Sequence, residues 1–143
     1  MTEKNNENQD IFLDLKKRLN ENPNDVEAAS ALANICYDNQ EPAQAIVYYR
    51  IALDIDPTSP SLRTDMATMY WQIDNVAHAE QEYRKVIKSH PGFGNAYLNL
   101  GFLLMHAKKE VKGARVVWTN LITGWPKDPS APKIRDLLME TMH

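Results

Sequence analysis

The chain has 143 residues, 43% of them hydrophobic, and a formal net charge of −3, which is ordinary for one soluble globular domain. This acidic balance argues against a dedicated nucleic-acid-binding protein, because such proteins normally carry a basic face. No apolar run approaches the roughly 18 residues of a membrane-spanning helix, so we expect no membrane span. A single cysteine excludes an internal disulfide.

The N-terminal segment divides into a polar part and an amphipathic part. Residues 1–9 are rich in Asn, Glu and Gln, which predicts a disordered tail. They have no apolar stretch like that of a signal peptide, so we expect a cytoplasmic protein, with a soluble domain of an exported or membrane-anchored protein as the alternative. From Asp10 onward, apolar residues at helical spacing (Ile11, Phe12, Leu15 and Leu19) predict a helix over about 10–21. It ends before Pro23, and we interpret it as an N-terminal capping helix.

Two further helices are predicted after Pro23. Asn24, followed three residues later by Glu27, resembles a capping box and predicts a helix over about 25–38. Pro42 suits the first turn of a helix, where its missing N–H costs little, and predicts a second helix over about 42–54.

The rest of the chain repeats this arrangement. Ser59 and Pro60 provide a cap and a first helical residue, so helices are predicted over about 60–72 and 76–89. Gly92 and Gly94 precede a third pair, over about 95–107 and from a turn at 108–113 to about 123. Asp128-Pro129 predicts a last helix over about 129–142, which would cap the C-terminal end of the array.

The same residue types recur at a fixed interval along these helix pairs. The marks of the first pair return 34 residues later and then again, with an interval of 35 beyond Leu104. One residue has therefore been inserted between Leu104 and Ala114. The three sets are Leu32-Ala33, Cys36, Ala45, Tyr49, Ala52 and Pro57; Met66-Ala67, Tyr70, Ala79, Tyr83, Val86 and Pro91; and Leu100-Gly101, Leu104, Ala114, Trp118, Leu121 and Pro126.

A period in the thirties indicates stacked helical repeats, and this one resembles the tetratricopeptide repeat (TPR) family, whose pattern is W-x-x-L-G-x-x-Y, then Ala, an aromatic and Pro. The resemblance implies an all-α superhelix, a TPR solenoid. Its three full helix-turn-helix repeats, about 26–59, 60–93 and 94–128, would form one domain over 10–143 with the two capping helices. The chain departs from the family pattern at the Trp position (Ala29, Arg63 and Tyr97) and at two of the Tyr positions (Cys36 and Leu104).

No group of residues in the sequence supports catalysis. The chain has no nucleophile elbow, no HExxH motif, no Gly-rich phosphate loop and no Cys/His pair at ligand spacing, so we expect neither an enzyme nor a cofactor or metal. Cys36 stands on a core position and is interpreted as a small buried hydrophobe. The recurring aromatics Tyr49, Tyr83 and Trp118 are also interpreted as core.

What remains is a binding surface. In TPR arrays the first, or A, helix of each repeat lines a concave face that commonly takes peptides, and the resemblance places ten candidate peptide-binding residues on it. They are Asn34, Tyr37, Asp38, Thr68, Trp71, Gln72, Asn99, Phe102, Met105 and His106. Tyr37, Trp71 and Met105 form a large apolar row spaced by 34, which favours a binding strip. The alternative is that this row packs across neighbouring helices or under the last helix.

The charges of the residues in the groove indicate which charge the ligand should carry. Some chaperone-binding TPR domains hold an acidic peptide between Lys and Arg side chains, whereas this chain has Ser30, Thr64 and Leu98 at the matching positions, with Asp65 nearby. A bound carboxylate would lose its hydration there without a cationic partner. The sequence therefore predicts a neutral or basic, apolar protein or peptide ligand, bound with affinity on the order of micromolar.

These inferences favour a non-catalytic adaptor, scaffold or assembly factor that holds a peptide or helix in the A-helix groove. One alternative is a scaffold that self-associates as a homo-oligomer through its capping helices, with Phe12 and Met142 as contacts. Another is a weaker resemblance to the TPR parts of cytochrome c maturation factors. Lys108, Lys109, Lys112 and Arg115 form the only basic cluster, which we interpret as a solvated turn, with a contact to an anionic partner as the alternative.

Overall fold

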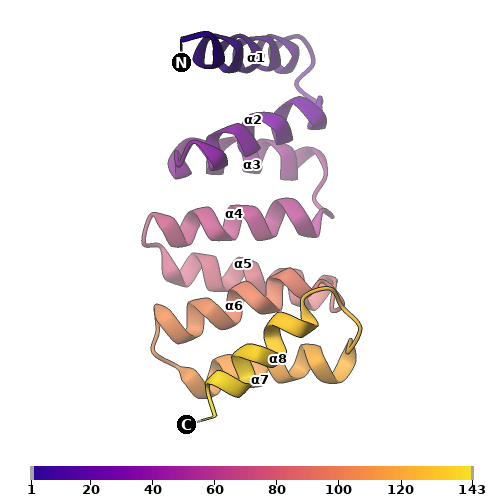
Figure 1. Ribbon diagram of the computed structural model, residues 1–143. Helices are drawn as coiled ribbons and strands as arrows, with labels where there is room; N and C mark the ends of the chain where they lie inside the picture. Colours follow the sequence, from indigo (N-terminus) through magenta and orange to yellow (C-terminus); the bar gives the residue numbers. More distant parts are fainter. Residues whose placement is uncertain (1, 143) are drawn as a thin grey trace. The chain divides into compact units, whose positions relative to one another are not determined.

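The computed structural model describes residues 2–142, and within that range the chain forms eight helices and no strand, as expected for an all-α protein (Figure 1). The helices are α1 (Thr2–Glu21), α2 (Val26–Asp38), α3 (Pro42–Ile55), α4 (Pro60–Gln72), α5 (Val76–Ser89), α6 (Gly94–His106), α7 (Val111–Gly124) and α8 (Ala131–Glu140). None of these helices is both long enough and apolar enough to cross a bilayer. The chain packs as two compact units, and the boundary between them in the sequence falls between Leu62 and Arg63, in the first turn of α4. The prediction of a single domain stays a prediction.

In the first unit, α1 is attached to the start of α2 near its own C-terminal end and to α3 from its middle. The Arg18 guanidinium donates hydrogen bonds of 3.2 Å to both carboxylate oxygens of Asp25, and Asp25 in turn caps α2 by accepting the Ala28 N–H. The hydrogen bond from Ala28 lowers the pKa of Asp25. Phe12 meets the ring of Tyr48 on α3 edge-on, with centroids 6.1 Å apart. Phe12, an oligomer contact in the self-association alternative, therefore packs inside its own unit.

The start of α1 differs from the prediction. The helix begins at Thr2 instead of Asp10, so the segment expected to be a disordered tail is helical from its second residue. Composition indicated disorder because almost all of these residues are polar. However, the segment contains neither Pro nor Gly, and a helix that is already formed gains one hydrogen bond for each residue that extends it.

The three helix pairs share one geometry except at a single turn. The A helices α2, α4 and α6 each have 13 residues, and their partners α3, α5 and α7 each have 14. The turns within the pairs span 39–41, 73–75 and 107–110. The inserted residue therefore lies in the last of these turns, which overlaps the predicted 108–113, and the helices on either side keep their lengths.

Each of these turns contains one residue in the left-handed region, at Gln40 (φ 58°), Asp74 (φ 66°) and Lys109 (φ 59°). The N–H of the residue that follows bonds back to the A helix, as in Glu41 N–H to the Cys36 carbonyl at 2.9 Å. The turns thus end the A helices with a backbone conformation that suits glycine better than a side chain.

We expect Lys109→Gly to raise the free energy of unfolding by about 0.5–1 kcal/mol, because glycine removes the steric cost of a positive φ. Urea denaturation measures the change. The control is Asn120→Gly, at an exposed position in the interior of α7, where glycine should instead cost up to about 1 kcal/mol. Equal losses in the two variants would contradict the prediction.

The core is formed by the recurring residues. Tyr49, Tyr83 and Trp118 are fully buried and Cys36 is 1% exposed, so the prediction that they are core residues is confirmed. Burial also raises the pKa of the Cys36 thiol, as expected of an inert cysteine. At the C-terminal end, α8 buries Ala131, Ile134 and Leu137.

Candidate functional site

The ten predicted binding residues all lie on A helices and none is buried. Asn34, Tyr37 and Asp38 are on α2 in the first unit, and the other seven are on α4 and α6 in the second unit. Asn34, Asp38, Gln72 and His106 are exposed, and Tyr37, Thr68, Trp71, Asn99, Phe102 and Met105 are half-buried. These side chains are accessible enough to contact a ligand, but some of them also make contacts within the fold and others do not.

One position of each A helix covers the buried aromatic of its partner helix. The Tyr49 hydroxyl donates to Asn34 Oδ1 at 3.0 Å, and the Tyr83 hydroxyl lies 2.6 Å from Thr68 Oγ1. In the third repeat the equivalent residue, Phe102, has no polar group and contacts Trp118 edge-on, with centroids 5.8 Å apart. These three predicted binding residues therefore also hold the helix pairs together.

His106 extends the third contact. Its ring stacks on Phe102 at 5.9 Å between centroids, with an interplanar angle of 21°. Met105, next to it, is half-exposed. The outer side of α6 therefore presents an apolar surface of Phe102 and Met105, bordered by an imidazole.

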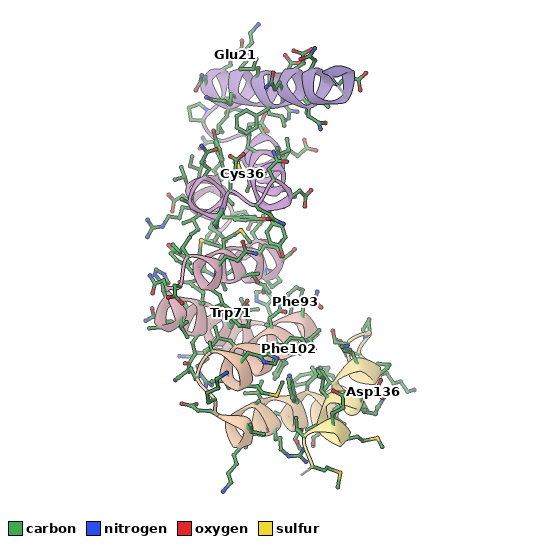
Figure 2. The ribbon with its side chains drawn as sticks, turned by 60° about the vertical axis from the view of Figure 1, so that its left-hand side comes forward. Glu21, Cys36, Trp71, Phe93, Phe102 and Asp136 are labelled. Carbon is green, nitrogen blue, oxygen red and sulfur yellow. The ribbon has the colours of Figure 1, made fainter. Side chains whose placement is uncertain are left out.

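Trp71 is less involved in the fold than these residues. Its side chain is half-exposed, and within residues 2–142 its indole takes part in no hydrogen bond and no ring contact. Figure 2 labels it on α4, together with Phe102 on α6. A tryptophan N–H usually finds a hydrogen-bond partner when it is buried. The N–H and the exposed ring surface of this indole are therefore available to a ligand.

Asp65 lies on the same side of α4 as Thr68 and Gln72, because residues three and seven positions apart share a helix face. It is half-buried, and its carboxylate has no hydrogen bond or ion pair with the residues that the structure describes. Burial raises the pKa of this carboxyl to about 6, so it is mostly ionised at pH 7. Sequence reasoning noted Asp65 near the groove, but its desolvation depends on tertiary packing.

The residues at the positions that match a carboxylate clamp are uncharged, and their side chains differ in solvent exposure. Thr64 is 3% exposed, and its Oγ1 has no hydrogen-bond partner among the residues that the structure describes. Ser30 and Leu98 are half-buried. The structure thus provides no cation at these three positions, and Thr64 is too deeply buried to contact a ligand.

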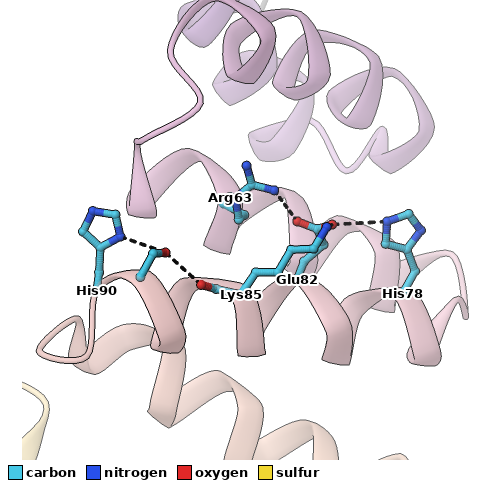
Figure 3. Close-up of polar contacts among 6 residues, drawn as sticks. Arg63, His78, Glu82, Lys85 and His90 are labelled. Atoms are coloured by element: carbon cyan, nitrogen blue, oxygen red, sulfur yellow. Dashed lines mark hydrogen bonds and ion pairs between the residues drawn. The ribbon is translucent and has the colours of Figure 1, made fainter.

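A buried carboxylate on α5 organises the charges of the second unit. Glu82 Oε2 lies 2.7 Å from Arg63 Nη1, and Oε1 lies 3.4 Å from Lys85 Nζ and 3.5 Å from His78 Nε2 (Figure 3). His78 also stacks on Tyr70, with ring centroids 3.8 Å apart. The cluster ties α5 to α4, and its groups are used within the fold.

The predicted basic cluster does not remain a set of free cations. Lys108 Nζ lies 2.9 Å from Glu80 and 3.4 Å from Glu110. Arg115 donates to the Leu138 carbonyl at 2.6 Å and to Thr141 Oγ1 at 2.7 Å, at the C-terminal end of α8. Two of its four members are therefore neutralised or used in packing, which supports the interpretation as an ordinary surface turn.

Comparison with known proteins gives one curated relative and several solved structures. No protein-family model matches the chain. The tetratricopeptide repeat and J domain-containing co-chaperone DNJ1 of Fusarium oxysporum f. sp. lycopersici is 31% identical over 87 residues, which cover 57% of this chain and 17% of that protein. The chain thus spans less than a fifth of the length of that relative.

Among solved structures, MamA matches with a TM-score of 0.75 and 23% identity over 90% of this chain and 75% of that one. The first TPR domain of Spaghetti (RPAP3), bound to the HSP90 peptide SRMEEVD, matches with a TM-score of 0.69 and 19% identity over 81% of this chain and 91% of that one. Together with the repeated helix pairs, these likenesses show that the chain has the tetratricopeptide repeat fold, an all-α array of helix-turn-helix repeats.

Proposed function

We propose that the chain is a protein-interaction module that holds a neutral or basic, apolar peptide segment against its A helices. The observation that carries the proposal is Trp71, a large half-exposed aromatic whose indole has no partner among residues 2–142. Tryptophan is among the residues that contribute most to binding energy, because it buries a large area and can donate a hydrogen bond. A buried core tryptophan such as Trp118 could not do this.

The charge preference follows from Asp65. A half-buried carboxylate without a partner has lost part of its hydration and gained no compensating interaction. A Lys or Arg side chain of a ligand would supply that interaction, whereas an acidic ligand would be repelled. Phe102 and Met105 on α6 would add apolar contact area.

The comparison with Spaghetti concerns the type of ligand. That TPR domain binds SRMEEVD, a peptide with three acidic residues. This chain has Ser30, Thr64 and Leu98 where a carboxylate clamp would place cations, and Asp65 directly follows Thr64 in the sequence. The proposal is therefore peptide binding with the opposite charge preference.

We expect Trp71→Ala to weaken peptide binding at least about tenfold, because truncating a central tryptophan removes 2 kcal/mol or more, while stability changes little. The measurement is the affinity of peptides selected from a phage-displayed random library against the full chain. The matched control is Val116→Ala, an exposed apolar residue on α7, which should leave binding unchanged.

The variant Asp65→Asn tests the predicted charge preference in the same experiment. The selected peptides should be poor in Asp and Glu, and those containing Lys or Arg should lose affinity for Asp65→Asn at pH 7 while uncharged ones should not. Acidic consensus peptides, or peptides that bind Trp71→Ala as well as the wild type, would refute the proposal. Unfolding of Trp71→Ala, visible by circular dichroism, would show that this residue is core.

A further inference from the structure

A cavity of about 480 Å³ lies within the first unit, between α1 and the turn that joins α2 to α3. Its apolar lining comes from Phe12 and Leu13 on α1 and from Ile35 and Cys36 on α2. The volume falls within the range of about 300–1,000 Å³ in which proteins bind ligands. Arg18 fastens the C-terminal part of α1 to Asp25 at the start of α2, and the cavity lies beside the contact of Phe12 with Tyr48 on α3.

The remaining lining is unusually rich in amide side chains. Asn8 and Gln9 on α1, Asn39 after α2 and Gln44 on α3 all border the cavity. Each offers a carbonyl acceptor and an NH2 donor pair, the same groups that a peptide main chain presents. The side-chain amide of Gln44 makes only one weak hydrogen bond within the described residues, in which its Oε1 accepts from the Cys36 thiol at 3.8 Å.

The cavity also borders apolar surface that folding has not covered. Leu13 is 61% exposed although it lines the cavity. A second hollow of about 200 Å³ shares Asn8, Ile35 and Asn39 with the first, and is lined in addition by Asp38 and by Ile11, which is 51% exposed. Two large apolar side chains in the middle of α1 therefore lie beside hollows into which a ligand could extend.

We propose that this cavity binds an extended segment of a partner protein, which inserts one bulky apolar side chain and pairs its flanking main-chain groups with the Asn and Gln side chains. An extended segment fits because its N–H and C=O groups are unpaired, whereas those of a helix are satisfied internally. Among the lining residues whose side chains the structure describes, Glu41 is the only charged one, and its carboxylate disfavours anionic ligands such as phosphates or carboxylates. This site lies on the first unit and does not depend on Trp71.

The test uses capped amino acids, which are the smallest pieces of an extended chain. The full isotope-labelled chain is titrated with acetyl-leucine methylamide, acetyl-glycine methylamide and acetyl-leucine with a free carboxylate. We expect the NMR chemical shifts of the backbone amides of Cys36, Asn39 and Gln44 to change saturably with the capped leucine. The capped glycine should produce no saturable change. The free carboxylate should bind at least about threefold more weakly because of Glu41.

Two variants locate the binding. Leu13→Glu should weaken the binding of the capped leucine at least about fivefold, which corresponds to roughly 1 kcal/mol of binding free energy. Val47→Glu, on a residue of α3 that is 55% exposed and outside the lining, should not. Trp71→Ala should also have no effect, so failure here and failure of the groove proposal can be told apart. Absence of saturable shifts, equal binding by Leu13→Glu, or saturation by free indole but not by the capped leucine would overturn the inference.

Discussion

Substitution of Gly101 by Ala should lower the free energy of unfolding by about 2 kcal/mol, because the added methyl group would overlap the indole of Trp118. Both residues are buried, and the nearest atoms lie in the ring itself, which cannot move aside as a flexible side-chain end could. Alanine would otherwise be favoured over glycine inside α6 by up to about 1 kcal/mol, so the expected loss is the net of these opposing effects.

The other repeats show why this glycine is required. Their equivalent small residues are Ala33 and Ala67, and they are matched with Tyr49 and Tyr83. The third repeat has the larger indole of Trp118 and compensates by omitting the methyl group. The two positions therefore behave as a matched pair, one small and one aromatic, across each pair of helices.

A double-mutant cycle measured by urea denaturation tests this pairing. In the Gly101→Ala background, Trp118→Tyr should recover at least about 1 kcal/mol, because it restores the combination found in the first two repeats. The control is Gly124→Ala, which should not destabilise, because the same methyl group would there meet no described atom within 4 Å apart from its chain neighbours and its own helix backbone. Additive losses for Gly101→Ala and Trp118→Tyr would show that the indole and the glycine are not coupled.

Arg63→Tyr should be more damaging, with a loss of about 3 kcal/mol, because it removes the closest cation from a buried carboxylate. The side chain of Glu82 is 5% exposed, and its 2.7 Å bond to Arg63 is the shortest of its contacts. The double substitution Arg63→Tyr with Glu82→Val reproduces the Tyr97 and Val117 pair of the third repeat, and we expect it to recover most of that loss.

The loss from Arg63→Tyr should depend on pH. Burial by itself would raise the pKa of Glu82, but the bond from Arg63 and the charges of Lys85 and Arg63 outweigh burial and lower that pKa below 4.5. The ionised carboxylate therefore stabilises the wild type above pH 4.5, and this contribution disappears as the pH falls through the lowered folded-state value. The stability gap between wild type and Arg63→Tyr should narrow over the same range. A gap that stays constant down to full protonation would mean that the ion pair contributes nothing.

The sequence by itself determined the helical repeat. The 34-residue recurrence and the aromatics at Tyr49, Tyr83 and Trp118 act within one turn or one helix pair, so they could be interpreted without coordinates. Two cap predictions were wrong by one or two residues: Asp25 and not Asn24 caps α2, and α8 begins at Ala131 instead of at Pro129. The start and end of α4 and α5 agree with the predicted ranges, and the single insertion was correctly assigned to the third repeat.

Only the tertiary structure decided which polar and apolar groups were left for a ligand. Asn34, Thr68 and Phe102 were predicted as binding residues, but each also contacts the aromatic of its partner helix. Lys108 pairs with Glu80, 28 residues away in the sequence, and Glu82 collects its cations from two helices. Burial and pairing depend on residues that are distant in the chain, so a local pattern can place a side chain on a helix face but cannot show which partners it meets there.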